Sequence, residues 1–294
     1  MLNYKTLQVG VITVLLLSAT ILLSSLTINP PVKKLTVQEA LQQNLITLDV
    51  ISNGGYSEKS VKLRLKTNSR SELSLLLPGG TIYEPENGNE QTLIQLEDKE
   101  ILVNGNGTYN GSIDAFCTEA SDRCPSENGN FTLGSTNNDK LKKLVTFLGE
   151  NKMKSDNFQS AVWAITDDHS VSNIDPREAK SKALRKYLCE ITGKKDNWYT
   201  SPQDVAVDPY GNFNFETVRI NGEIGFDCNR GKKISEDICN AEGEVMFSSS
   251  STFTPMTDHV RYNFNLSVKG WEKGDYYVLI KDETGELARF AFQV

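Results

Sequence analysis

The sequence predicts a mainly β protein with a few helices (α+β), divided into two domains. Two observations indicate the class. Apolar and polar residues alternate over most of the chain, which is the period of a half-buried strand, whereas helical periodicity is confined to a short segment after residue 36 and to residues 138–192. A third observation indicates the division, because 294 residues exceed the roughly 100–200 of one typical domain.

The N-terminus contains an uncharged run over residues 7–26, preceded by Lys5. A helix of this length can cross the hydrocarbon core of a membrane. The run is longer than the core of most cleaved signal peptides and lacks an A-x-A-like end, so an uncleaved anchor and a cleaved signal both stay open. We therefore expect residues 1–31 to direct the chain into the cell envelope. The protein would be anchored in the inner membrane and face the periplasm. If the N-terminal segment is cleaved, the protein would be secreted or lie at the cell surface.

Residues 35–170 are expected to form a β-rich domain with packed helices. Thr36 and Glu39 have the spacing of a capping box and predict a short helix. Alternation between residues 46 and 116 predicts about six strands in an antiparallel sheet or small sandwich. Apolar residues then recur at helical spacing and predict two helices, residues 138–151 and 158–166.

Residues 171–208 are expected to be a helical linker. Asp175-Pro176 is typical of a helix N-terminus, and the charge-rich residues that follow, as far as Thr192, indicate a solvated helix. The rest of this segment has the composition of a loop.

Residues 209–294 return to strand periodicity, and Asn221-Gly222 is a hairpin signal. The string Lys-Gly-Asp-Tyr-Tyr-Val at residues 273–278 resembles the terminal strands of bacterial immunoglobulin-like and fibronectin type III-like modules. We therefore expect an immunoglobulin-like β-sandwich as the second domain.

Charge and histidine content exclude several function classes. The net charge is −7 and no basic patch is present, so we expect no nucleic-acid partner. His169 and His259 are the only histidines, neither has ligand spacing, and we expect no metal site and no cofactor. Asp167-Asp168-His169 is interpreted as a polar helix end, and no known catalytic motif is found. We therefore expect no enzymatic activity.

Five cysteines are consistent with an oxidising compartment. Their spacing favours two short-loop disulfides, Cys117–Cys124 and Cys228–Cys239. Cys189 is then left over, and both intermolecular pairing and a buried inert thiol stay open for it.

Two short strings carry a resemblance to a known family. They are Phe-Cys-Thr-Glu at residues 116–119 and Phe-Gln-Ser-Ala-Val-Trp at residues 158–163. Their order resembles the thioester domains of bacterial surface adhesins, which are named for a T-Q-x-A motif. The resemblance implies that Cys117 is the thiol and Gln159 the acyl donor of an internal thioester, although Phe158 stands where that family has threonine.

A second resemblance covers residues 36–170, which are similar to uncharacterised bacterial envelope proteins with a Q-x-A-V-W-x-x-[ST]-D helix. It implies no activity. A Cys117–Cys124 disulfide would use the thiol that the thioester needs, so these two alternatives stay open.

The expected function is that of a non-enzymatic interaction or structural protein of the cell envelope. It would be tethered to the membrane by residues 7–26, or secreted, and bind an unknown protein partner. The alternative is a thioester-type adhesin that forms a covalent bond between Gln159 and an amine of its partner.

Overall fold

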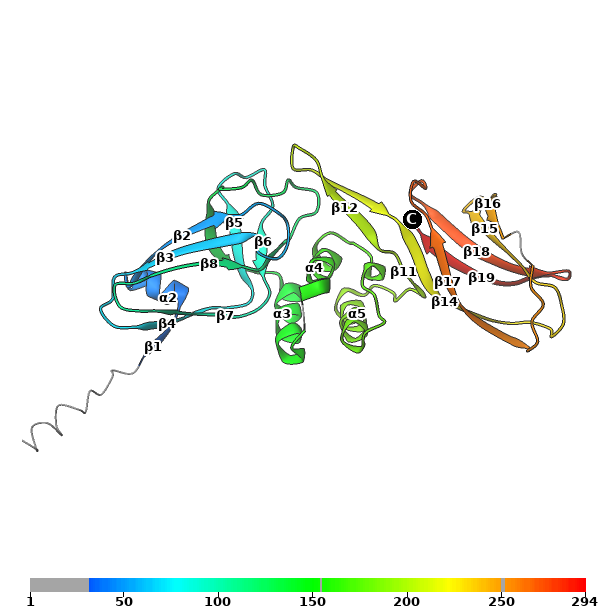
Figure 1. Ribbon diagram of the computed structural model, residues 1–294, viewed down its shortest axis with the longest axis horizontal. Coiled ribbons are helices and arrows are strands. Elements are labelled where there is room, and N and C mark those ends of the chain that lie inside the picture. The colour runs from blue at the N-terminus through cyan, green and yellow to red at the C-terminus, as the bar shows by residue number, and fades with distance from the viewer. Residues whose placement is uncertain (1–31, 154, 250–251) are drawn as a thin grey trace, which may run out of the picture.

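The computed structural model describes residues 32–153, 155–249 and 252–294. The fold is mainly β, with 43% strand and 18% helix, which confirms the predicted class. Figure 1 shows a β-rich region at one end, helices in the middle and a second β region at the other end. None of the described helices is long and apolar enough to span a membrane. The predicted membrane segment, residues 7–26, lies outside the described residues.

The first β region consists of three small sheets. Its strands are β1 (Lys33–Thr36), β2 (Ile46–Ser52), β3 (Val61–Thr67), β4 (Leu73–Leu77), β5 (Thr81–Pro85), β6 (Leu93–Gln95), β7 (Lys99–Val103), β8 (Thr108–Ile113), β9 (Ala115–Cys117) and β10 (Phe131–Ser135). The sheets have the orders β1-β4-β7, β2-β3-β8 and β10-β5-β6-β9, and only the β1–β4 pair is parallel among them.

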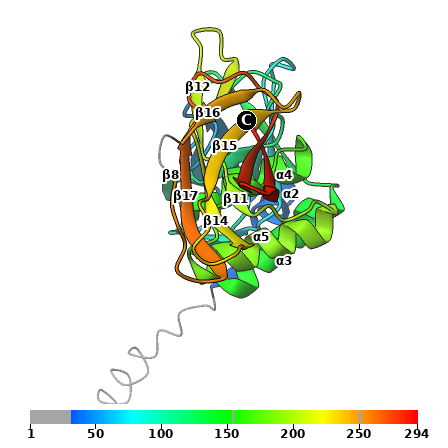
Figure 2. The same cartoon turned by 90° about the vertical axis from the view of Figure 1, so that its right-hand side faces the viewer.

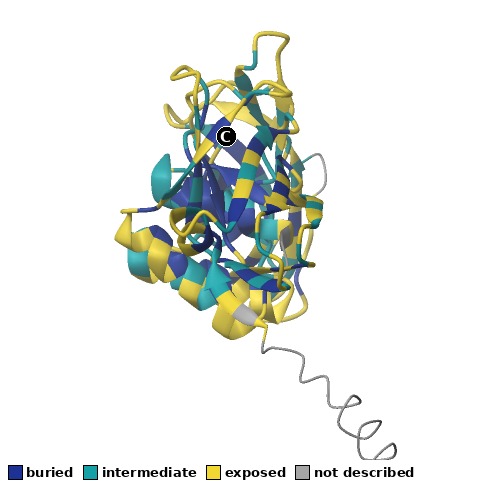
Figure 3. Ribbon diagram, turned by 90° about the vertical axis from the view of Figure 1, so that its left-hand side faces the viewer, coloured by how far each residue is buried: buried dark blue, intermediate teal, exposed yellow. Residues whose placement is uncertain are grey.

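The alternating leucines of β3 and β4 point into the core of this region, where Leu63 and Leu75 are fully buried. Buried residues line the inside of the sheets, and exposed residues lie on the loops and outer surfaces (Figure 3). The predicted capping box is confirmed before α2 (Val37–Gln42). Thr36 N donates to Glu39 Oε2 at 2.7 Å, and Glu39 N donates to Thr36 Oγ1 at 3.1 Å.

The middle of the molecule is helical. It contains α3 (Asp139–Asn151), η1 (Ser155–Asn157), α4 (Phe158–Thr166), η2 (Val171–Asn173) and α5 (Ala179–Thr192). The side chain of Asn138 caps α3, whereas Asn157 does not cap α4 and donates to Ser181 Oγ instead. Helix α4 packs on β9, where the rings of Phe116 and Phe158 meet edge to face with centroids 5.6 Å apart.

Helix α5 differs from the predicted linker helix in two respects. It begins at Ala179, later than the Asp175-Pro176 signal, because Asp175 accepts hydrogen bonds from Arg177 and makes a separate turn. The charge-rich composition also predicts a solvated helix, yet Leu184 and Leu188 are buried in the core shared with α3 and α4. Because one face is apolar, α5 completes the helical layer.

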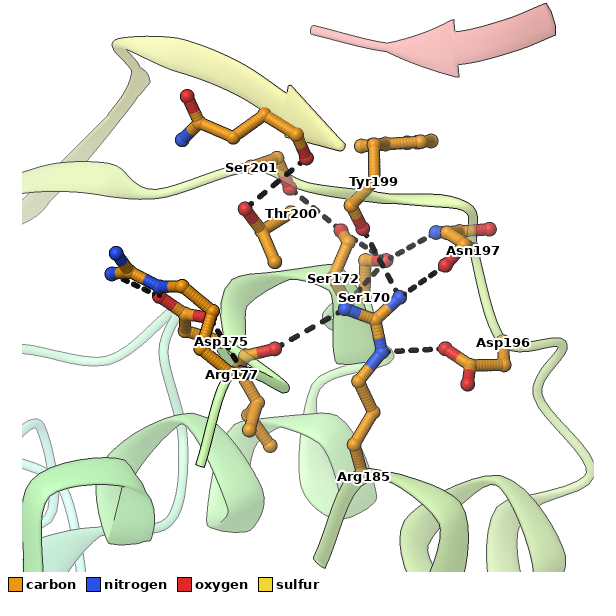
Figure 4. Close-up of polar contacts among 12 residues, drawn as sticks. Ser170, Ser172, Asp175, Arg177, Arg185, Asp196, Asn197, Tyr199, Thr200 and Ser201 are labelled. Atoms are coloured by element: carbon orange, nitrogen blue, oxygen red, sulfur yellow. Dashed lines mark hydrogen bonds and ion pairs between the residues drawn. The ribbon is translucent and has the colours of Figure 1, made fainter. Parts of the chain in front are cut away.

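Arg185 of α5 ties the chain that follows the helix back onto it (Figure 4). Its guanidinium is almost fully buried and donates to Asp196 Oδ1 and to three backbone carbonyls, those of Ile174, Asn197 and Tyr199. Five N–H donors in a planar fork match several acceptors at once, so this side chain fixes where the second β region begins.

The second β region is a sandwich of two sheets, in agreement with the expected architecture. Its strands are β11 (Tyr199–Thr200), β14 (Arg219–Asp227) and β17 (His259–Ser267) in one sheet, and β16 (Val245–Ser248), β15 (Ser235–Asn240), β18 (Asp275–Asp282) and β19 (Gly285–Gln293) in the other. Figure 2 views the sandwich from its end. Ile220 and Ile224 of one sheet share a buried core with Val278 and Ile280 of the other.

The hairpin predicted at Asn221-Gly222 is wrong, because β14 runs through both residues. Gly222 lies under the indole of Trp198, and a Cβ atom on it would come within 2.7 Å of Trp198. The glycine is therefore needed here because it lets an aromatic ring approach the strand backbone closely.

A separate hairpin leaves the sandwich and reaches back towards the first β region. It consists of β12 (Gln203–Val207) and β13 (Phe213–Thr217), which pair only with each other among the described strands. Figure 1 shows it rising above α4. The composition of residues 193–210 predicts a loop, so sequence reasoning missed β12.

Candidate functional site

Cys117 and Gln159 come together between β9 and α4. Gln159, in the first turn of α4, holds the backbone of Cys117 with both atoms of its carboxamide. Cys117 N donates to Gln159 Oε1 at 3.0 Å, and Gln159 Nε2 donates to the Cys117 carbonyl at 2.8 Å. The Cys117 N–H is shared with the carbonyl of Tyr56, at 2.9 Å. Strand β9 lies at the edge of its sheet, which leaves these backbone groups available for α4.

This arrangement holds the Gln159 amide beside the residue that carries the thiol. In a strand, the N–H and C=O of a residue lie near the plane of the sheet, and its side chain leaves that plane. The Gln159 carboxamide pairs with these in-plane backbone groups of Cys117, and the Cys117 side chain leaves their plane. A nucleophile approaches a carbonyl carbon from the face of the amide plane.

The site is buried and lies among acidic side chains. The Cys117 side chain is fully buried, and burial raises the pKa of its thiol well above the usual range. The neighbouring Cys124, Glu119 and Asp167 raise this pKa further. Burial also raises the pKa of the Glu119 carboxyl, an effect that hydrogen bonds from Thr118 and Thr92 partly offset. The thiol is therefore protonated at neutral pH, and bulk water is kept away from it.

Four aromatic side chains pack together in the core cluster that contains Cys117; we call them the aromatic cover. Trp163 lies one helical turn after Gln159, on the same side of α4, and is 4% exposed. The ring centroids of Tyr56, Phe213 and Phe215 lie 5.8, 5.7 and 5.2 Å from that of Trp163.

The hairpin β12–β13 supplies half of this cover. Phe213 and Phe215 are two residues apart on β13, so both face Trp163. At the tip of the hairpin, the carbonyl of Gly211 accepts a hydrogen bond from Cys124 N at 2.8 Å. Sequence reasoning missed these residues, because the alternation of Phe213 and Phe215 predicts a strand but not the surface that the strand covers.

All five cysteines are free in this structure, so the predicted Cys117–Cys124 and Cys228–Cys239 disulfides are not formed in it. Cys228 follows β14 and Cys239 lies in β15, and these strands belong to different sheets of the sandwich. Cys189 lies half-buried on α5.

The residues Asp167, Asp168 and His169 do not form one cluster. Asp167 accepts a hydrogen bond from Ala120 N, whereas Asp168 points into solvent and pairs with Lys194. His169 packs against Trp163, and burial lowers its pKa, which favours the neutral imidazole. In the part of the chain that the structure describes, no group of three or more His, Cys, Asp or Glu residues is arranged to hold a metal ion.

Comparison with known proteins identifies no family. No family model matches the sequence, and no curated protein matches it. Among solved structures, a β-glucosidase from Kluyveromyces marxianus aligns at 10% sequence identity and a TM-score of 0.20. The alignment covers 80% of this chain and 44% of the β-glucosidase chain. The chain thus spans less than half the length of that enzyme, and a score this low carries no argument about fold or function.

Proposed function

We propose that this chain is an extracytoplasmic interaction protein of the cell envelope whose first β region forms an internal thioester between Cys117 and Gln159. The observation that supports the proposal is the pair of hydrogen bonds between the Gln159 carboxamide and the Cys117 backbone. They hold the Gln159 amide against the backbone of the residue that carries a buried thiol, 42 positions earlier in the sequence. The resemblance to adhesin thioester domains implies the same two residues.

The reaction uses only groups of this chain. Cys117 Sγ attacks Gln159 Cδ, and the Cys117 N–H, already donated to Oε1, stabilises the charge that develops on that oxygen. The bond from Cδ to Nε2 breaks, and the thiol proton leaves with the nitrogen as ammonia. The product is a thioester, a stored electrophile. An amine of a partner protein then attacks Cδ, forms an amide and releases the Cys117 thiol.

Burial accounts for the survival of such a bond. Hydrolysis needs water at Cδ, and the aromatic cover together with the buried β9 keeps water out. The chain makes one bond per molecule and does not turn over, so it is not an enzyme in this proposal. Residues 7–26 would hold it at the membrane, with the two β regions outside the cytoplasm.

The test is an intact mass of the full chain in mild detergent, without reductant. Thioester formation removes ammonia, about 17 Da, and methylamine then adds to Gln159. Cys117→Ser and Gln159→Ala should show no loss, whereas Cys189→Ser, which removes a remote thiol, should behave as the wild type. A loss of about 2 Da with linked Cys117 and Cys124 peptides would overturn the thioester and leave a disulfide-stapled, non-covalent interaction protein.

A further inference from the structure

Helix α4 contacts the Cys117 segment at both of its ends. Gln159 holds Cys117 from the first turn of the helix, and Asp167, the residue that ends the helix, holds Ala120. Asp167 Oδ1 accepts a hydrogen bond from Ala120 N at 2.7 Å, and Asp167 Oδ2 accepts one from Thr166 Oγ1 at 2.6 Å.

The two segments have comparable spans. From Gln159 to Asp167 the helix rises about 12 Å, at about 1.5 Å per residue. From Cys117 to Ala120 the chain covers at most about 10 Å. Two ties at this separation prevent the Cys117 segment from sliding along α4 and from pivoting about Gln159.

Helix stability does not account for an aspartate at this position. The C-terminal end of a helix carries a partial negative charge, which disfavours a carboxylate. Asp167 is half-buried there, and the charge-assisted hydrogen bond that it accepts from a backbone N–H offsets this unfavourable position. The group that it holds belongs to the segment of the proposed nucleophile.

We propose that Asp167 is a positioning residue for thioester formation, which keeps Cys117 in register with the Gln159 amide by holding Ala120. The inference rests on the proposed function. Intramolecular attack depends steeply on placement, and a displacement of about 1 Å can cost about 100-fold in rate. Asp167 does not touch the reacting atoms and acts through the backbone of residues 117–120.

The experiment follows ammonia loss by intact mass after the full chain is diluted from denaturant with reduced thiols. Asp167→Asn keeps an acceptor oxygen at the same distance but removes the charge, so formation should stay within about 3-fold of the wild type. Asp167→Glu keeps the charge but moves the acceptor by one methylene, and it should be about 10-fold to 100-fold slower, as should Asp167→Ala. Asp168→Asn removes a neighbouring charge and should match the wild type.

The outcomes separate the two proposals. If the wild type never loses ammonia, the proposed function is wrong and this inference falls with it. If the wild type loses ammonia and Asp167→Ala or Asp167→Glu does so at the same rate, only the positioning role is overturned. If Asp167→Ala does not fold, Asp167→Asn and Asp167→Glu decide. A fast Asn variant with a slow Glu variant supports positioning, and the reverse order overturns it.

Discussion

The ring of Phe215 meets the indole of Trp163 edge on, at an interplanar angle of 88° and a centroid distance of 5.2 Å. Phe215 belongs to the hairpin β12–β13, and Trp163 belongs to the helix that carries Gln159. The hairpin is inserted between β11 and β14 of the sandwich, so a segment of the second β region reaches back to the candidate site of the first (Figure 1).

Phe215→Ala should therefore open the site to water. We expect the proposed thioester to hydrolyse several-fold faster and to react several-fold faster with methylamine, because part of the aromatic cover is lost. The measurement is the decay of the ammonia-deficient mass with time. Tyr210→Ala at the exposed hairpin tip is the control, since that side chain is 76% exposed. Equal decay in the Phe215 variant and the wild type would show that the hairpin does not protect the site.

The structure agrees with the sequence at two places where the determining signals are local. The capping box of Thr36 and Glu39 closes within four residues, and the bounds predicted for α4 from its apolar spacing, residues 158–166, are those observed. Asn221-Gly222 misleads because Trp198, more than 20 residues away, determines what the glycine does.

The same reason limits prediction of the site. Resemblance suggests the pair Cys117 and Gln159, but no local pattern indicates that Asp167 reaches Ala120 or that Phe213 and Phe215 cover Trp163. These contacts depend on how β9, α4 and the hairpin pack against one another, which single-sequence periodicity does not encode.

Gly222→Ala should destabilise the sandwich. The new Cβ would lie 2.7 Å from atoms of Trp198, and this backbone and ring cannot both stay in place. Overpacking of this kind costs about 1–3 kcal/mol in the free energy of unfolding. Urea unfolding would measure this change in the free energy of unfolding. Gly225→Ala on the same strand is the matched control, because the nearest atoms there lie at an ordinary 3.8 Å. A loss of similar size in both variants would mean that glycine replacement in β14, and not the Trp198 contact, causes the effect.

The free energy of unfolding should depend on the Cys117 thiol at alkaline pH. Burial raises its pKa in the folded chain, so the unfolded chain loses the thiol proton first as the pH rises. This contribution to stability is complete below the unfolded pKa of about 8.5 and declines above it, by up to about 1.4 kcal/mol per pH unit. The decline ends only when the pH passes the raised folded value.

Two variants isolate this contribution. Gln159→Ala keeps the Cys117 thiol free, and Cys117→Ser in the same background removes the titrating group. Unfolding in urea at pH 7 to 10 should show a steeper loss of stability in the first variant than in the second. Parallel pH profiles would mean that the thiol ionises equally readily in both states, which contradicts its burial.

Arg185→Ala should loosen the junction between the helical layer and the sandwich. The change leaves the buried carbonyls of Ile174 and Tyr199 without the donors that now satisfy them. Losing partners of buried polar groups costs about 1–3 kcal/mol each, and the cavity left by the side chain adds to it. Arg185→Lys should recover only a small part of the lost stability, because a single ammonium cannot reach all the acceptors that the planar guanidinium now contacts.

Arg177→Ala is the matched control for Arg185, since its side chain is 89% exposed and pairs with a neighbour two residues away. We expect unfolding by urea to shift strongly for Arg185→Ala and by less than about 0.5 kcal/mol for Arg177→Ala. Hydrogen exchange at the backbone amides of residues 196–201 should rise in the Arg185 variant, because the guanidinium holds that segment against α5. Unchanged exchange there would mean that the packing of β11 alone fixes the junction, and that Arg185 contributes only to the core of the helical layer.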